Sequence, residues 1–476
     1  MVHYIIERKS RMFSCPNCGG NVKFDIPSQK LLCDFCHEHF DPYAFEDKKS
    51  DAEETPSAES AFEATIFTCP QCGGEILSTD NSAAEFCSFC GASTILYSRI
   101  SHEKRPNFII PFKKTKEDCK QAYSEFMKKA IFAPKELKDP KYIDGFRGIY
   151  MPYWAFYVTQ RGDISIPAKK QYRRGDYLIT DHYNLEGSLD AYYKGLSYDA
   201  SSSFADSISE TLAPYDLKGM KSFTPAYLSG FYADVADVPA SVYQQAAEAT
   251  ATEESIKKIR KQPQFSGYAI NSSKAASLVN TKTETIDSTM FPVWFMSYRK
   301  NDRVAYVTVN GQTCKISADV PIDPKKFILS SIILSIPLFF LFLLFTLLPT
   351  TLVGFTIFLA VLTLILYASE LNSIHRKDTG ADDRGMQYRN RLRKIGQPLG
   401  DSERKGTLGY VTTISAIVVC ALVLFLRPVS DLFYYAAAIF SLAAVGICLW
   451  DLIRCYNILS TRRLPQFDRT GGDDRA

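Results

Sequence analysis

The stretch CPNCGGNVKFDIPSQKLLCDFC, Cys15–Cys36, returns later in the chain as CPQCGGEILSTDNSAAEFCSFC, Cys69–Cys90. Each copy has two Cys-x-x-Cys pairs separated by a gap of the same length. Two residues between thiolates let both sulfurs reach one ion at about 2.3 Å, and the Gly-Gly after the first pair lets the backbone turn. The residues between the pairs are typical of two short strands around a polar turn. Each copy therefore predicts a zinc ribbon.

The alternative for these cysteines is a disulfide framework. The chain starts MVHYIIERKS, without the apolar core of a secretory signal peptide, so we expect a reducing compartment and metal-bound thiolates. Four sulfurs complete a tetrahedral site, so the zinc, two ions per chain, would be structural and would supply about 10 kcal/mol of folding free energy to each module. His37 and His39 are possible substitute ligands, but the sulfur set is already complete. The predicted ligands are Cys15, Cys18, Cys33, Cys36, Cys69, Cys72, Cys87 and Cys90.

The other cysteines lack metal spacing, and we expect them to be small buried hydrophobic residues. They are Cys119, Cys314, Cys420, Cys448 and Cys455.

The C-terminal part of the chain is strongly apolar. No charged residue occurs from Phe327 to Ser369, about twice the roughly 20 residues that span a bilayer, so this segment predicts a helical hairpin. Its turn is expected at Leu348–Thr351, where Pro349 would end the first helix, with a kink at Pro337. Gly406–Leu426 and Leu432–Trp450 predict a second hairpin, for four spans in total.

Positive charge predicts the orientation of these spans, because Lys and Arg resist translocation. The flank before the first span, the connector Glu370–Lys405 and the tail are basic, whereas the hairpin turns offer only Arg427. We therefore expect a multi-pass cell-membrane protein with both termini and the connector in the cytoplasm. The Arg-rich part of the connector could bind anionic lipid or only set the orientation. Its cations are Arg384, Arg389, Arg391, Arg393 and Lys394.

The middle of the chain predicts a soluble α+β domain. Thr115 and Asp118 form a capping-box pattern for a helix through Ala130, and a second helix is expected at Ser241–Lys261. Two related motifs, YMPYW and MFPVW, place Trp154 and Trp294 two residues after a proline. These tryptophans could form a groove for an extended peptide, but core anchors of two related half-sheets are the preferred hypothesis. Strands are expected at NFIIPF (107–112), Ile149–Thr159, Tyr177–Leu185 and Ser188–Tyr193, with a hairpin at Phe291–Ile316.

Several function classes lack support in the sequence. The predicted spans contain no charged residue that would mark an ion path, and there is no phosphate-binding loop. No Lys or Arg occurs between Phe62 and Tyr97, so the second ribbon is acidic and we expect no nucleic-acid binding. His182 is the one histidine of the soluble domain past its N-terminal flank, and no nucleophile set accompanies it. The sequence therefore predicts a protein that is not an enzyme.

The architecture resembles a group of bacterial membrane-anchored proteins with TFIIB-type zinc ribbons, the YdjG type. The resemblance depends on the CPxCGG and CxFC knuckles, the IPF that follows them, the YMPYW strand and the C-terminal spans. It implies a non-enzymatic part of an envelope-stress assembly that recruits a phage-shock-protein-A-like coat to the membrane, with the eight knuckle cysteines as zinc ligands.

Together these patterns predict a multidomain, membrane-anchored scaffold that docks cytoplasmic or peripheral membrane proteins through two ribbons on a flexible lead. The alternatives are a membrane-tethered nucleic-acid-binding regulator and an oligomeric channel or exporter. The expected parts are zinc ribbon 1 (1–45), an acidic linker (46–64), zinc ribbon 2 (65–98), the soluble domain (99–324), a first hairpin (325–369), the basic connector (370–405), a second hairpin (406–453) and the tail (454–476).

Overall fold

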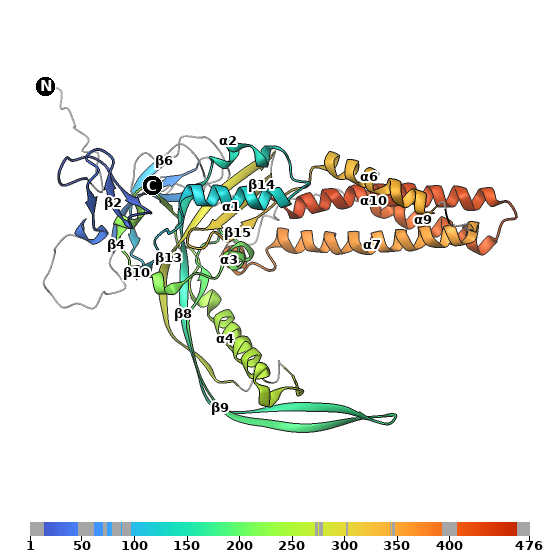
Figure 1. Ribbon diagram of the computed structural model, residues 1–476, viewed down its shortest axis with the longest axis horizontal. Helices are drawn as coiled ribbons and strands as arrows, with labels where there is room; N and C mark the ends of the chain where they lie inside the picture. The colour runs from blue at the N-terminus through green and yellow to red at the C-terminus, as the bar shows by residue number, and fades with distance from the viewer. Residues whose placement is uncertain are drawn as a thin grey trace.

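The structure, a computed structural model, describes residues 14–45, 61–69, 74–78, 87, 97–271, 275, 279–300, 303–342, 344, 348–392 and 407–463. Its described parts follow one another along the long axis of the molecule (Figure 1): a small N-terminal sheet, a body built on a large sheet, and a group of long helices. The expected multidomain organisation is confirmed at this level.

The N-terminal sheet carries the first cysteine motif. It consists of β1 (Val22–Asp25), β2 (Lys30–Cys33) and β3 (His39–Phe40), paired antiparallel in that order and followed by η1 (Pro42–Phe45). Val22 and Phe24 of β1 are buried while Lys23 between them is exposed, the alternation of a strand with one covered face.

The covered face of this sheet lies against the body. The Phe24 ring packs against Tyr227 and Phe231, with ring centroids 5.2 and 6.4 Å apart, and its backbone N–H donates to the carbonyl of Ser229 at 3.0 Å. Cys15, Cys33 and Val22 belong to the same hydrophobic cluster as the body's aromatic residues. The first module therefore packs on the body, because so small a module closes its core with residues of its neighbour. The acidic linker expected at 46–64 lies outside the described residues up to residue 60.

The body contains one mixed sheet, in which the described residues form thirteen strands. Its main path runs β10-β7-β13-β8-β11-β5-β4-β6. The strands are β4 (Ala61–Thr68), β5 (Glu75–Ser78), β6 (Tyr97–Lys104), β7 (Phe108–Ile109), β8 (Arg147–Arg174), β9 (Tyr177–Asp199), β10 (Lys221–Ser222), β11 (Tyr232–Ala233), β12 (Ala269–Ile270), β13 (Thr281–Lys300), β14 (Arg303–Asn310), β15 (Ile316–Ala318) and β16 (Arg462–Arg463).

The second cysteine motif is continuous with this sheet. β5 pairs with β4 on one side and with β11 of the body on the other, through Ser78 and Tyr232. β6 pairs with β4 over its whole length and runs across the boundary expected between residues 98 and 99. The strands around the second motif thus form one end of the main path of the body's sheet, with β6 as the last strand of that path.

The two Pro-x-Trp motifs lie on adjacent antiparallel strands at the centre of the sheet. Pro152 of β8 pairs with Met290 of β13, and Pro292 of β13 pairs with Tyr150 of β8, so a local pseudo-twofold axis relates the motifs. The indole N–H of Trp154 donates to the Val238 carbonyl at 2.8 Å, and that of Trp294 to the Lys114 carbonyl at 2.9 Å. Both rings pack against core clusters. This confirms the hypothesis that the tryptophans are core anchors and not the walls of a peptide groove.

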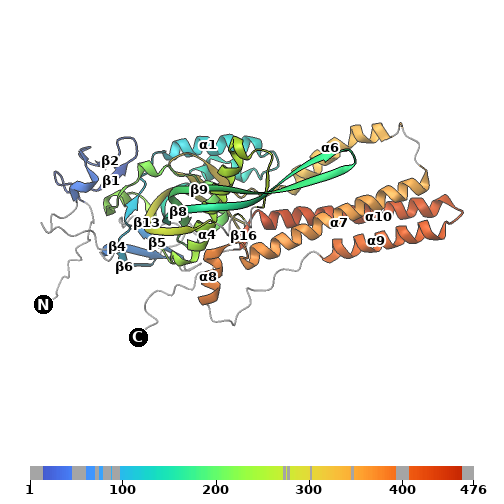
Figure 2. The same cartoon turned by 90° about the horizontal axis from the view of Figure 1, so that it is seen from below.

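The long hairpin of β8 and β9 is the main departure from the expected elements. The sequence pattern divided it into three shorter strands, but the pairing runs from Tyr153/Asp199 to Arg174/Tyr177 with one irregularity at Phe156/Val158. Its outer half leaves the body as a two-stranded arm (Figures 1 and 2). Both faces of the arm's outer end are exposed, so the alternation that usually marks a strand is missing there.

The soluble helices agree with their start and stop signals. α1 (Lys116–Lys129) has the predicted capping box, with Thr115 Oγ1 accepting from the Asp118 N–H. α4 (Ser241–Lys261) has the expected bounds and buries Tyr243, Ala247 and Ala251 against β8 and β9. α2 (Pro140–Ile143) and α3 (Asp206–Leu212) are short.

Within the described part of the chain, four helices are long and apolar enough to cross a membrane. They are α6 (Pro324–Phe342), α7 (Pro349–Thr379), α9 (Thr407–Leu426) and α10 (Asp431–Leu459), with the short α8 (Arg384–Leu392) after α7. Pro349 begins α7, where its missing N–H costs nothing. α7 and α10 continue well past the expected apolar segments, toward the body (Figure 1).

Candidate metal centre

The first cysteine pair sits in a tight turn before β1. The Cys15 N–H donates to the Gly20 carbonyl at 2.8 Å, and the Gly19 N–H donates to the Cys15 carbonyl at 2.8 Å. Gly19 has φ +70°, a value that favours glycine. A Cβ at Gly20 would lie 2.4 Å from Cδ2 of Phe35, so the second glycine lets the Phe35 ring cross the turn.

The second pair follows β2 and is tied to the first. The His37 N–H donates to the Cys33 carbonyl at 3.1 Å, and the Asp34 N–H donates to the Asn21 carbonyl at 3.1 Å. This second bond joins the two turns and brings their sulfurs together.

The four thiols of the first motif form a compact group. Cys15 Sγ lies 3.5 Å from Cys36 Sγ, Cys18 Sγ lies 3.5 Å from Cys33 Sγ, and all four sulfurs are within 4.8 Å of one another. A tetrahedral ion with bonds of about 2.3 Å places its sulfurs about 3.8 Å apart, so the group fits a metal ion. Among the described residues the group consists of cysteines, and neither His37 nor His39 is part of it.

Titration of the thiols also favours a cation. The backbone N–H of Cys36 is the main cause that lowers the pKa of Cys33 to about 6. At Cys36 the Glu38 N–H favours the thiolate, but desolvation and the hydrogen bonds with Cys15, Cys33 and Cys18 raise the pKa to about 12. The Cys33 thiolate therefore forms readily, whereas Cys36 resists ionisation next to it. A bound cation removes the repulsion between neighbouring thiolates.

The second motif can be compared only in part. Cys69 and Cys87 are fully buried, and the Cys69 N–H donates to the Gly74 carbonyl at 2.9 Å, which repeats the Cys15 to Gly20 bond. Cys72 and Cys90 lie outside the described residues. The remaining cysteines behave as expected: Cys119, Cys420, Cys448 and Cys455 are buried, and Cys314 is half-buried.

A cleft beside the N-terminal sheet was not predicted. It has a volume of about 360 Å³ and lies between the N-terminal sheet and the body, lined among others by Lys23, Lys116, Arg147 and Trp294. Lys23 is already paired with Asp34 at 2.8 Å. Burial, followed by the charge of Arg147, lowers the pKa of Lys116.

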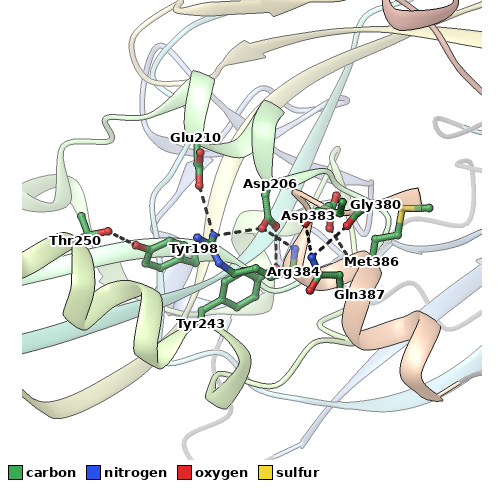
Figure 3. Close-up of polar contacts among 11 residues, drawn as sticks. Tyr198, Asp206, Glu210, Tyr243, Thr250, Gly380, Asp383, Arg384, Met386 and Gln387 are labelled. Carbon is green, nitrogen blue, oxygen red and sulfur yellow. Dashed lines mark hydrogen bonds and ion pairs between the residues drawn. The ribbon is translucent and has the colours of Figure 1, made fainter. Parts of the chain in front are cut away.

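A second polar cluster joins the basic connector to the body (Figure 3). The backbone N–H of Arg384, at the start of α8, donates to Asp206 Oδ2 at 3.0 Å, and its guanidinium lies 3.6 Å from Glu210 Oε1. Tyr243 of α4 donates to the other Asp206 oxygen at 3.0 Å, and the Asp206 side chain is only 5% exposed. No sequence pattern predicted this contact, because the acids and the arginine are far apart in the chain.

Arg384 therefore contacts the soluble domain. Of the other cations that could bind lipid or only set the orientation, Arg389 and Arg391 lie on α8, and Arg393 and Lys394 lie outside the described residues. His182 is an exposed residue of the arm, paired with Lys169 across the ribbon.

Comparison with known proteins finds a distant relative. The chain is 28% identical over 324 residues to the uncharacterized protein YdjG of Bacillus subtilis, an alignment that covers 66% of this chain and 91% of the relative. No protein-family model matches the chain. No solved structure matches it either.

Proposed function

We propose that this protein is a non-enzymatic, membrane-anchored scaffold that docks a cytoplasmic or peripheral membrane protein through its first cysteine module. The metal is structural zinc, because four sulfurs at tetrahedral spacing suit Zn²⁺ and leave no open position for catalysis. A second zinc is held by Cys69, Cys72, Cys87 and Cys90. The spans hold both termini and the basic connector on the cytoplasmic side.

The exposure of Phe35 is the observation that carries this proposal. Phe35 lies between two predicted ligands, Cys33 and Cys36, and 73% of the residue is exposed. The turn is fixed by backbone hydrogen bonds, so the ring is presented on a rigid support. A large aromatic side chain held in this way contributes contact area at little entropic cost when a partner covers it.

The resemblance to ribbon proteins of the envelope-stress type suggests the class of partner. A phage-shock-protein-A-like coat protein is the first candidate. It would have to extend past the body, because the module lies at the end of the molecule away from the apolar helices (Figure 1). Nucleic acid is a weaker candidate: Lys23 is paired with Asp34, so one of the few cations of the module is already neutralised.

The test is a comparison of two surface variants in native membranes. Phe35→Ala removes the exposed ring and keeps all eight cysteines, and Ile131→Ala removes an equally exposed apolar side chain from the body, 70% exposed. Proteins cross-linked to the tagged full-length chain are identified by mass spectrometry after solubilisation in mild detergent. We expect a peripheral membrane protein with wild type and Ile131→Ala, reduced at least fivefold with Phe35→Ala.

Two results would overturn the proposal. One is the same set of partners, in the same amounts, with all three proteins. The other is cross-linked nucleic acid that is recovered with wild type and Ile131→Ala and is lost with Phe35→Ala.

A further inference from the structure

The outer end of the β8–β9 arm has few contacts with the described part of the body, among them Lys170 Nζ over the Tyr268 ring, 5.6 Å from its centroid. The outermost strand of the body that pairs with the arm is β12, in which Ala269 pairs with Lys169 and Ile270 with Ala168 of β8. Beyond it the arm is a two-stranded ribbon that turns at Gly175, with φ +61°. Every residue from Lys169 to Leu178 is exposed. We call these residues the arm tip.

The arm tip combines apolar and cationic side chains. Tyr172, Tyr177 and Leu178 are 46%, 78% and 66% exposed. An isolated two-stranded ribbon is marginally stable in water, and side chains like these add no stability while they face solvent. They are placed to enter a less polar surrounding.

The cations of the arm tip are not neutralised by the protein. Among the described residues none of the four has an acidic partner within ion-pair distance, whereas Arg161 at the base of the arm lies 3.4 Å from Asp190. Asp176 is the one acidic residue of this stretch, so the arm tip is strongly positive. Its cations are Lys169, Lys170, Arg173 and Arg174.

The arm points the same way as the apolar helices. In Figure 1 and in Figure 2 it leaves the body on the side of α6, α7, α9 and α10, runs along their direction and ends level with α6. Helices that cross a bilayer fix the membrane plane roughly perpendicular to themselves. Because α6 is one of these spans, an arm that ends level with α6 reaches the membrane that contains them (Figures 1 and 2).

The lengths of the elements are consistent with this position. The part of α7 after its charge-free segment, Glu370–Thr379, adds about 15 Å of helix between the bilayer and the body. The unsupported part of β8, Lys170–Arg174, spans about 17 Å. The ribbon can thus bridge the gap that the helical extension creates.

We propose that the arm tip inserts into the headgroup layer of the membrane that α6, α7, α9 and α10 span, and that it binds anionic lipid there. Lys and Arg contact lipid phosphates, while the two tyrosines occupy the interface that aromatic residues prefer. This gives the body a contact with the bilayer at a distance from the helices.

The experiment uses trypsin cleavage after the tip cations of the full-length chain. The protein is placed one copy per nanodisc, in discs of phosphatidylcholine alone or with about 30% phosphatidylglycerol, and cleavage after Arg173 and Arg174 is timed by mass spectrometry. We expect cleavage at least tenfold slower in the anionic discs. Cleavage after Lys135, an exposed residue of the body, serves as the internal reference and should be unchanged.

Matched variants separate insertion from other causes of protection. Tyr177→Ser/Leu178→Ser keeps the four cations, and we expect it to lose most of the protection. Tyr192→Ser, which removes a tyrosine that is 57% exposed nearer the base of the arm, should be protected like wild type.

Three results would overturn the proposal. They are equal cleavage rates in the two kinds of disc, protection that soluble glycerol phosphate reproduces without lipid, and protection that appears only after addition of a cell extract. The last would identify the arm tip as a protein-docking site.

Discussion

Asp199 is a buried carboxyl group of the body with one oxygen that has no hydrogen-bond partner among the described residues. It ends β9, is 2% exposed, and its Oδ2 has no hydrogen-bond partner in the described structure. Burial, followed by the charges of Asp206 and Asp383, raises the pKa of Asp199 well above its ordinary value. The folded protein therefore holds this group in its neutral form over a wider pH range than the unfolded chain does.

This difference predicts a pH-dependent stability that Asp199→Asn removes. Because the folded-state pKa is the higher one, the wild-type contribution is complete below about pH 4 and is lost as pH rises toward the folded pKa. An amide has no charge to bury, so the variant should gain in melting temperature relative to wild type between about pH 5 and pH 8. Asp190→Asn, at an exposed residue of the arm, is the control. The explanation would be contradicted if the difference in melting temperature between Asp199→Asn and wild type were the same at about pH 5 and about pH 8.

At the level of elements, Asp451 joins the two helices of the second hairpin. It lies in α10, one residue past the predicted end of the span, and is 7% exposed. Its Oδ2 accepts from the Gly409 N–H at 3.1 Å, in the first turn of α9, where backbone N–H groups lack helical partners. A Cβ at position 409 would meet Asp451 Oδ2 at 2.7 Å and the Cys448 backbone at 3.1 Å, so glycine allows the close contact.

Asp451→Ala should therefore destabilise the hairpin by about 1 kcal/mol, the usual cost of losing a side chain that caps a helix. The measurement is the melting temperature of the detergent-solubilised full-length protein. Asp431→Ala, which removes an exposed carboxylate at the start of α10, should have a smaller effect. A larger effect of Asp431→Ala would show that this contact does not stabilise α9.

The elements also show what the sequence could and could not predict. α1 was predicted from the capping box that begins it, and α4 was also predicted, a helix that ends two residues before Pro263. The four thiols of the first motif were predicted from spacing alone. The full length of β8 and β9 and the Asp206–Arg384 contact were missed, because each depends on residues distant in the chain.

At the scale of the whole molecule, the metal module and the body share one core. Cys15, Cys33 and Phe24 lie in the same cluster as Tyr227 and Phe231. The Phe231 ring stacks on Phe112, with centroids 4.5 Å apart, and Phe112 packs against Trp294 at 5.1 Å. A chain of aromatic contacts therefore runs from the cysteine turns to the centre of the large sheet, and the order of the module should affect the order of the body.

Removal of the metal should reveal this coupling. Without the ion the four thiols lose the interaction that holds the module, so a chelator should unfold β1 and β2 and expose one side of the aromatic cluster. Hydrogen exchange of the full-length protein should then rise at 22–33 and also at 223–233, while α9 and α10 keep their protection as an internal control. Adding back zinc should restore both regions. A rise confined to residues 14–45 would show that the module rests on the body without contributing to its stability, and the aromatic contacts would then be energetically minor.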